Sequence, residues 1–246
     1  MQLRPHITFV STAVDIQSAI DALPVGGGTV YVSRGTYVLT TLTFPSDRPC
    51  RLVGEGAGIT ILSFAAQNKD LDLVKVRYSY SGLEDLTIVG NPVAGAGRGI
   101  VVGSTTHVVR DCHFRNIVVY NTPNEALSCL GTAELGGGYF TFLNTFENCV
   151  FRLNYSAGAT STGMVYIGAG CTTIRFVHCT FDTFKGSAIS DFSGVAGGGN
   201  ALEYCNIEGP ADDAQHWVLL STAMYPKVIG CWFENTTGFH GKYKVH

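Results

Sequence analysis

One short pattern of apolar positions recurs between residues 83 and 233. It reads apolar-x-x-Cys-x-apolar in five places, and a sixth copy has leucine at the cysteine position. The fourth positions are 86, 112, 149, 179, 205 and 231. The step from 86 to 112 has the same length as each of the last two steps, and the two steps between are longer. Self-similarity at a period of about 20 to 50 residues is typical of stacked repeats. The copies are 83–88, 109–114, 146–151, 176–181, 202–207 and 228–233.

Within each copy the apolar fourth and sixth positions flank one outward position, which is the period-2 alternation of a strand. Two adjacent outward positions precede the fourth residue, and this break predicts a tight bend. The shortest step has room for a strand, a loop, a second strand, a bend and a third strand, and the longer steps indicate loop insertions. The pattern therefore predicts an all-β fold, a single-stranded right-handed parallel β-helix with one copy per turn. The runs that predict the earlier strand of each turn are 74–76, 100–102, 127–130, 164–167, 189–192 and 218–220.

Stacking of these turns would bring equivalent residues within about 4.8 Å of each other. The cysteine position then predicts one buried column. Cysteine in such a place behaves as a small apolar side chain, and the sequence has no Cys-x-x-Cys pair. We therefore expect reduced packing thiols and no metal ion in the column formed by Leu86, Cys112, Cys149, Cys179, Cys205 and Cys231.

The two outward positions at each bend form further columns. In one of them Arg110 is expected to lie between Glu84 and Glu147, where its charge offsets the repulsion between the carboxylates. Exposed ion pairs of this kind contribute only about 0 to 1 kcal/mol. We expect these carboxylates to have structural roles.

A helix is predicted to close the N-terminal end of the solenoid. Ile16, Ile20 and Leu23 share one apolar face, and Pro24 with the glycines at 26–28 ends the helix. Capping is expected because an open end exposes strand edges. The predicted organisation is an N-terminal arm at 1–12, a β-helix at 13–236 that begins with the capping α-helix 13–23, and a C-terminal tail at 237–246.

Charge and hydropathy exclude several classes of function. The formal net charge is −3, only 14% of residues are charged, and no run of Lys or Arg is present, which argues against nucleic-acid binding. No apolar run is long enough to cross a bilayer, so no membrane span is expected. The start of the chain lacks the apolar stretch of a secretion signal, so we expect synthesis in the cytoplasm. No cofactor is expected.

Four segments near the start of the chain carry a family resemblance: Ile-Gln-Ser-Ala-Ile-Asp-Ala at 16–22, Gly-Gly-Thr-Val-Tyr-Val at 27–32, Gly-Thr-Tyr at 35–37 and Leu-Val-Gly-Glu-Gly at 52–56. With them the chain resembles the pectate-lyase-like β-helix superfamily, in the branch that includes phage tailspikes and virion-associated glycan enzymes. Ser33 departs from the family, in which proline usually precedes the Gly-Thr-Tyr turn. The motif covers about residues 13–60, and the repeats extend the likeness in architecture to about 236. The resemblance implies the fold and leaves function open, because lyases, hydrolases, epimerases and binding-only virion proteins share this N-terminal motif.

Paired carboxylates are the first candidates for chemistry. A polysaccharide hydrolase needs two of them about 5 to 10 Å apart, and the acidic pairs are Asp70 with Asp72, Asp182 with Asp191, and Asp212 with Asp213. Partial echoes of polygalacturonase motifs include Asp70 and the pair at 212–213. Most of the repeats lie between position 70 and position 212, so these groups would stand several turns apart. We interpret the echoes as coincidence.

A lyase would need a calcium site and a base. Arg110, close in sequence to Asp111 and predicted to lie beside Glu84, Asp85 and Glu147, is the nearest approach to that arrangement, although two of these acids are more simply its charge partners. The catalytic candidates are therefore Asp212, Asp213 and Arg110, and no intact catalytic constellation or metal site is expected.

Exposed aromatic rings beside polar groups predict sugar binding, because a ring stacks on the apolar face of a sugar. Trp217 follows an acidic loop, so the glycan-binding candidates are Trp217, His216, Asp212 and Asp213. The alternative is that outward aromatic residues pack against a loop or a neighbouring subunit.

Apolar residues on the outside predict a subunit interface at Val177, Ile229 and Trp232. The short segments before the cap helix and after the last repeat leave no room for the anchoring and trimer-locking domains that the resemblance implies for enzymatic tailspikes. We therefore hypothesise a phage virion protein, a homotrimer that decorates a capsid or joins a tail adhesion device, with bacterial surface polysaccharide as a further partner. The competing hypothesis is a lyase or glycoside hydrolase that depolymerises this glycan.

Overall fold

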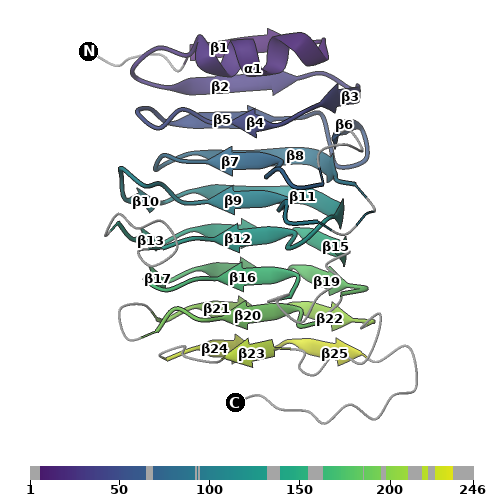
Figure 1. Ribbon diagram of the computed structural model, residues 1–246, viewed down its shortest axis with the longest axis vertical. Coiled ribbons are helices and arrows are strands. Elements are labelled where there is room, and N and C mark those ends of the chain that lie inside the picture. Colours follow the sequence, from purple (N-terminus) through teal and green to yellow (C-terminus); the bar gives the residue numbers. More distant parts are fainter. Residues whose placement is uncertain are drawn as a thin grey trace.

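The computed structural model describes residues 6–64, 69–91, 93, 95–131, 139–154, 163–184, 186–194, 198–209, 218–220 and 225–234. The described chain winds into stacked turns, with helix α1 (Ala13–Asp21) and strand β1 (His6–Val10) at one end and strand β25 (Trp232–Glu234) at the other (Figure 1). The pairings between the described strands are parallel. The predicted all-β parallel β-helix is confirmed.

The apolar runs that precede the repeats form one sheet of seven strands within the described chain. Val74, Ile100 and Leu127 lie in register and are buried, and the column continues through Val165, Ile189 and Val218. The predicted strands at these positions are confirmed. In chain order they are β4 (Leu42–Thr43), β7 (Val74–Val76), β9 (Ile100–Val102), β12 (Leu127–Cys129), β16 (Val165–Ile167), β20 (Ile189–Asp191) and β23 (Val218–Leu220).

The repeats themselves lie in a larger sheet that folds around a bend. Two of its strands, β8 (Gly82–Val89) and β11 (His113–Thr122), continue through the bend and join the two halves. The others are β1, β2 (Gly28–Val32), β3 (Gly35–Leu39), β5 (Cys50–Val53), β6 (Thr60–Phe64), β14 (Thr145–Glu147), β15 (Val150–Asn154), β18 (Arg175–Val177), β19 (Thr180–Asp182), β21 (Ala201–Glu203), β22 (Asn206–Glu208), β24 (Lys227–Ile229) and β25. A small third sheet contains β10 (Val109–Arg110), β13 (Thr141–Phe142) and β17 (Cys171–Thr172).

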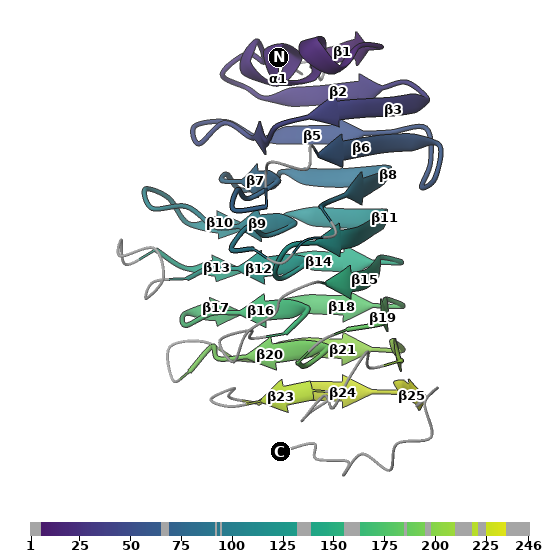
Figure 2. The same cartoon turned by 45° about the vertical axis from the view of Figure 1, so that its right-hand side comes forward.

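Stacked phenylalanine rings fill the interior of the middle turns. The centroid of the Phe146 ring lies 4.4 Å from that of Phe114 and 5.0 Å from that of Phe176. Phe151 and Phe181 form a second stack at 5.5 Å. All five rings are buried. Figure 2 shows the strands β14, β18 and β21 at successive levels of this region.

The structure corrects the predicted register of the turn around residues 109–122. Phe114, rather than Val109, lies between Leu83 and Phe146, and Ile117 aligns with Leu86. The turn from residue 84 to 115 and the turn from 115 to 147 are therefore nearly equal in length. The prediction had made the first of these turns short and the second long. Cys112 falls outside the predicted column, which runs through Leu86, Ile117, Cys149, Cys179, Cys205 and Cys231.

The misassignment arose because two corners of this turn have the same local chemistry. At the first corner Asp111 has a left-handed φ of 54° and precedes buried Cys112; at the second Asn116 has φ 51° and precedes buried Ile117. Short polar residues tolerate this conformation better than most. The cysteine stands at the first corner, where its backbone N–H donates to Asn144 Oδ1 at 2.9 Å.

The thiols pack as the sequence analysis expected. All eight cysteines are free, and those of the column donate weak S–H hydrogen bonds to carbonyl groups of the preceding turn. Cys179 Sγ lies 3.3 Å from the Phe146 carbonyl oxygen, and Cys205 Sγ lies 3.4 Å from that of Phe176. Burial raises the pKa of the displaced Cys112 thiol to about 12. The Cys112 thiol is therefore neutral in the core.

Helix α1 closes the N-terminal end of the core, as predicted. Ile16, Ile20 and Leu23 are buried against the first turn. The arm before the helix contains β1, which pairs with β2 and leaves Phe9 exposed against the ring of Tyr31 at 5.4 Å. Within the described part of the chain, no helix has the length and hydrophobicity that a bilayer crossing requires.

Candidate functional site

The predicted glycan-binding cluster, Asp212, Asp213, His216 and Trp217, lies outside the described residues. The sugar-binding prediction for that loop therefore stays a prediction, as does the catalytic role weighed for its two acids. The predicted interface residues do lie on the outside of the last three turns. Val177 is half-buried, Ile229 is 46% exposed and Trp232 is 65% exposed.

Arg110 does not occupy the predicted place between Glu84 and Glu147. It aligns with Phe142, its guanidinium pairs with the neighbouring Asp111 at 2.9 Å, and it stands 5.3 Å from the centroid of the Tyr80 ring. The lyase-like arrangement considered around Arg110 is therefore not formed. Among the described residues, no three carboxylate, imidazole or thiol side chains gather closely enough to hold one metal ion.

The other acidic pairs have separate partners. The carboxylate of Asp70 pairs with Lys69, and that of Asp72 receives two hydrogen bonds from Arg98, at 2.8 and 3.0 Å. Asp182 lies on β19 of the large sheet, whereas buried Asp191 lies on β20 of the seven-stranded sheet. Asp182 and Asp191 therefore do not form one site.

A charged group in the upper turns centres on Glu84. Its side chain is only 5% exposed, and its two carboxylate oxygens accept hydrogen bonds from Arg51 and Arg115. Burial, the largest single effect, raises the pKa of Glu84, but the hydrogen bonds and charges of the two arginines together lower it below its usual value. Arg115 thus has the role that the sequence analysis gave to Arg110, and this role is structural.

We expect the stabilisation by Glu84 to disappear in acid. Its folded-state pKa is lowered, so the contribution is complete above the unfolded-state pKa of about 4.3 and is lost as the pH falls through the lowered value. Glu84→Gln, which cannot ionise, should lower the free energy of unfolding by about 1 to 2 kcal/mol at pH 7. Urea unfolding of both proteins at pH 7 and near pH 3 checks this. A difference in unfolding free energy between the two proteins that stays constant across this pH range would contradict the stabilising role of the ionised Glu84.

The lower turns carry the ion pair between Arg175 and Glu203 and, separately, a column that is mostly acidic. Arg152, Asp182, Glu208 and Glu234 are in register on β15, β19, β22 and β25, each following a ladder residue of the core. Adjacent strands are separated by about 4.8 Å, so three carboxylates stand on consecutive turns. The sequence analysis missed this column, although an acid directly follows the last apolar position in the final three repeats.

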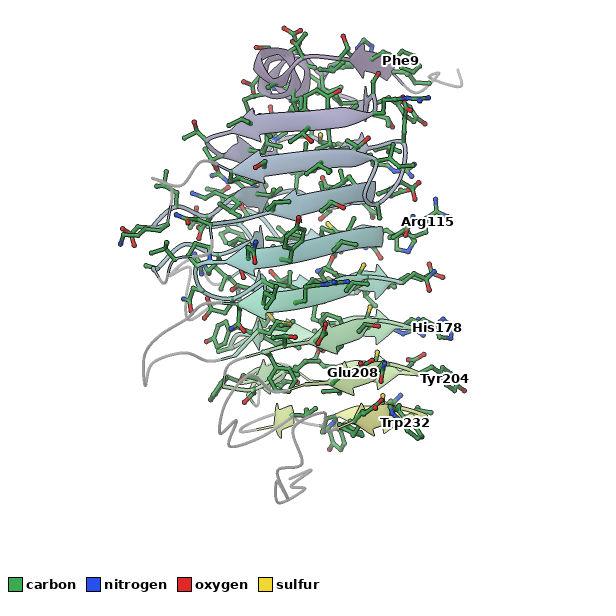
Figure 3. All side chains as sticks on the ribbon, turned by 90° about the vertical axis from the view of Figure 1, so that its right-hand side faces the viewer. Phe9, Arg115, His178, Tyr204, Glu208 and Trp232 are labelled. Carbon is green, nitrogen blue, oxygen red and sulfur yellow. The ribbon has the colours of Figure 1, made fainter. Side chains whose placement is uncertain are left out.

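Exposed rings lie on the same turns as these acids. His178 and Tyr204 occupy the same bend position on successive turns and stack with their ring centroids 5.6 Å apart. Trp232 follows on the next turn, and its indole N–H donates to Glu234 at 3.3 Å. Figure 3 shows His178, Tyr204 and Trp232 at three successive levels along one edge. We name this region the C-terminal outer surface; it comprises His178, Asp182, Tyr204, Glu208, Trp232 and Glu234.

Such a surface has the chemistry of a carbohydrate contact. Tyr204 is 59% exposed, and its ring and that of Trp232 offer apolar planes. The carboxylates accept hydrogen bonds from hydroxyl groups. Because the groups repeat at the strand spacing, the surface suits an extended chain better than a single compact ligand.

Solved structures from a virus and from a bacterium are among those similar to this chain. ORF18 of Geobacillus virus E2 aligns with a TM-score of 0.73 and 19% sequence identity, over 91% of this chain and 46% of that one. The chain has a parallel β-helix fold. A proposed glycosyl hydrolase from Parabacteroides merdae aligns with a TM-score of 0.55 and 14% identity, over 80% of this chain and 90% of that one. This β-helix spans less than half the length of the viral chain, and no protein-family model and no curated protein matches its sequence.

Proposed function

We propose that the protein is a polysaccharide-binding β-helix of a phage particle. The observation that carries the proposal is the C-terminal outer surface, where exposed Trp232 donates to Glu234, Tyr204 is exposed at the bend, and carboxylates stand on consecutive turns. Sugar rings stack on the aromatic planes while their hydroxyl groups donate to Glu208 and Glu234. Neighbouring turns then contact neighbouring parts of one glycan chain.

The placement in a virion rests on the resemblance of residues 13–60 to phage tailspikes and on the similar fold of a viral protein. In this proposal the particle assembles in the host cytoplasm, and capsid or tail proteins are the other partners. A homotrimer accounts for the exposed apolar side chain of Ile229, because burial between protomers removes it from water. Val177 belongs to the same proposed contact, whereas Trp232, which the sequence analysis also placed there, is assigned to the glycan surface.

Replacement of Trp232 by alanine is expected to weaken polysaccharide binding about two- to tenfold, since loss of one stacked ring costs about 0.5 to 1.5 kcal/mol. Affinity electrophoresis in gels that contain bacterial surface polysaccharides measures the effect. Phe9→Ala is the matched control, because Phe9 is an exposed aromatic residue at the opposite end of the stack (Figure 3). Equal retardation of the Trp232 and Phe9 variants would refute the binding surface.

Cleavage of the glycan is the second candidate function. It is favoured by the strand spacing of about 4.8 Å, which sets acids of successive turns at a separation comparable to that between the carboxyl groups of retaining glycosidases, about 5 to 5.5 Å. Glu208 is the central acid of the three, so Glu208→Gln should abolish release of reducing ends while polysaccharide binding persists. If the unmodified protein releases no reducing ends from any glycan that it binds, the binding-only function stands.

A further inference from the structure

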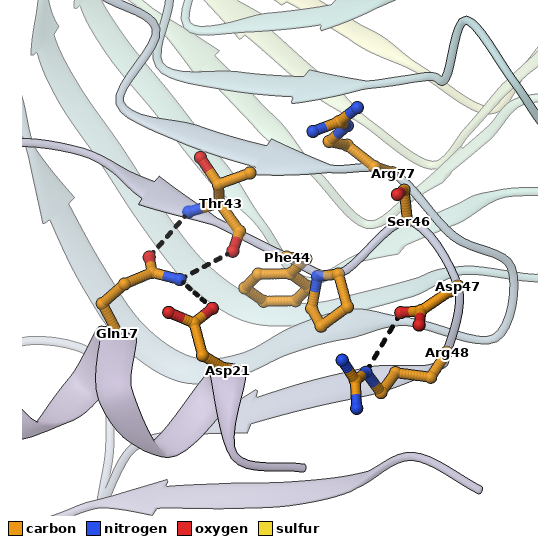
Figure 4. A pocket seen from close by; sticks show the side chains of 9 residues that line it. Gln17, Asp21, Thr43, Phe44, Ser46, Asp47, Arg48 and Arg77 are labelled. Atoms are coloured by element: carbon orange, nitrogen blue, oxygen red, sulfur yellow. Dashed lines mark hydrogen bonds and ion pairs between the residues drawn. The ribbon is translucent and has the colours of Figure 1, made fainter. Parts of the chain in front are cut away.

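A second candidate binding site lies beside the cap helix, away from the C-terminal outer surface. It is an open pocket with a volume of about 480 Å³ between α1, the loop that follows β4, and Arg77 after β7 (Figure 4). This volume is within the range of small-molecule sites, about 300 to 1,000 Å³. Nothing in the proposed function uses the pocket.

The walls of the pocket are held in place by contacts within the protein. The Gln17 amide accepts from the Thr43 N–H at 2.9 Å and donates to the Thr43 carbonyl at 3.0 Å and to Asp21 at 2.8 Å. Arg48 donates to the Leu23 carbonyl at the end of the helix and to Asp47 at 3.0 Å. The lining side chains are therefore arranged before any ligand arrives, which lowers the entropic cost of binding.

Several polar groups keep bonding capacity toward the pocket. Arg77 is half-buried, and neither its guanidinium nor the Ser46 hydroxyl makes a hydrogen bond or ion pair with another described residue. Asp21 contributes a second carboxylate oxygen. The pocket thus presents both donors and acceptors, with Pro45 as an apolar part of the wall.

The charge balance of this lining restricts the ligand. Two carboxylates, Asp21 and Asp47, face two guanidinium groups, Arg48 and Arg77, so the formal charge of the lining is zero. An anion would meet the carboxylates and a cation would meet the arginines. Arg77 could pair with an anion, but the carboxylates of Asp21 and Asp47 line the same pocket and offset that attraction. Neighbouring hydroxyl groups match the lining, because each donates to a carboxylate and accepts from a guanidinium.

We propose that this pocket binds one neutral sugar unit. Carboxylate and guanidinium groups hold its hydroxyls, and its C–H face lies against Pro45. The site is independent of Trp232 and binds a free monosaccharide glycoside.

Saturation-transfer NMR tests the proposal with methyl glycosides of glucose, galactose and N-acetylglucosamine, alongside glucuronate, inorganic phosphate and glycine. At least one neutral glycoside should give a signal that falls at least about fivefold in Arg77→Ala and in Asp21→Asn. Arg34→Ala is the matched control, because that arginine is 82% exposed and pairs with Glu55 elsewhere on the cap. Arg77→Gln replaces Arg77→Ala if the alanine variant does not fold.

Three results would overturn the proposal: no signal from any neutral glycoside, stronger signals from phosphate, glucuronate or glycine, or an undiminished signal in both pocket variants. The Trp232→Ala variant separates the two sites. Its glycoside signal should be unchanged, and loss of that signal would assign the sugar to the C-terminal outer surface instead. Polysaccharide binding that persists in Arg77→Ala shows that the proposed function stands independently of the pocket.

Discussion

Phe146→Ala should lower the free energy of unfolding by about 3 to 5 kcal/mol. The Phe146 ring is buried between Phe114 and Phe176, and Phe151 contacts it edge-on at 6.3 Å. Truncation removes the transfer free energy of the ring and leaves a cavity that strands fixed in register cannot close. The lost stacking contacts add about 0.5 to 1.5 kcal/mol for each aromatic pair, which places the effect toward the upper end.

Urea unfolding followed by circular dichroism measures this loss. Phe9→Ala removes an aromatic ring that is 76% exposed, so it should change the stability by less than about 1 kcal/mol. Phe146→Leu keeps most of the apolar volume and should fall between the two. In a solenoid each turn contacts only its neighbours, so a damaged middle turn can also split the transition into two steps. A Phe146→Ala protein as stable as Phe9→Ala would mean that the stacked core is wrong.

The lower half of the solenoid could be predicted in detail because its last two steps have the same length. From Phe146 onward, the apolar ladders follow directly from the repeat, and the structure keeps that register through Val228. The prediction failed one turn earlier, where Asp111-Cys112 imitates the corner formed by Asn116-Ile117. Both pairs satisfy the same local rule, and only cross-strand pairing distinguishes them.

The charged contacts could not be predicted for the same reason. The register error placed Arg110 beside Glu84 where the structure has Arg115, and local sequence contains no correction. The acids of the C-terminal outer surface could have been predicted, because Glu208 and Glu234 occupy the same position in successive repeats. They were missed because the predicted acidic pairs were close in sequence, whereas a solenoid brings together acids one turn apart.

A buried polar contact around Asn200 predicts a second large effect on stability. Asn200 Oδ1 accepts the Ile174 backbone N–H at 2.9 Å, and Asn200 Nδ2 donates to the Asp191 carboxylate at 2.9 Å. Asp191 is 1% exposed and also accepts from the Ser193 N–H. Asn200→Ala removes both bonds at once and leaves a buried N–H and a poorly satisfied carboxylate. We expect a loss of about 3 to 5 kcal/mol, because each unsatisfied buried group costs about 1 to 3 kcal/mol and charged groups cost more.

Asn144 offers a matched control for this substitution. It occupies the equivalent corner two turns earlier and accepts the Cys112 N–H at 2.9 Å, but its amide reaches only the Val109 carbonyl, at 3.5 Å. Asn144→Ala should therefore cost about 1 to 2 kcal/mol, and the difference between the two variants reports the bond to Asp191. In an Asp191→Ala background, which has no side-chain acceptor, the cost of Asn200→Ala should fall to that of Asn144→Ala. If the double variant shows no coupling, the carboxylate is not what makes Asn200 important, and backbone capping at the corner accounts for the whole effect.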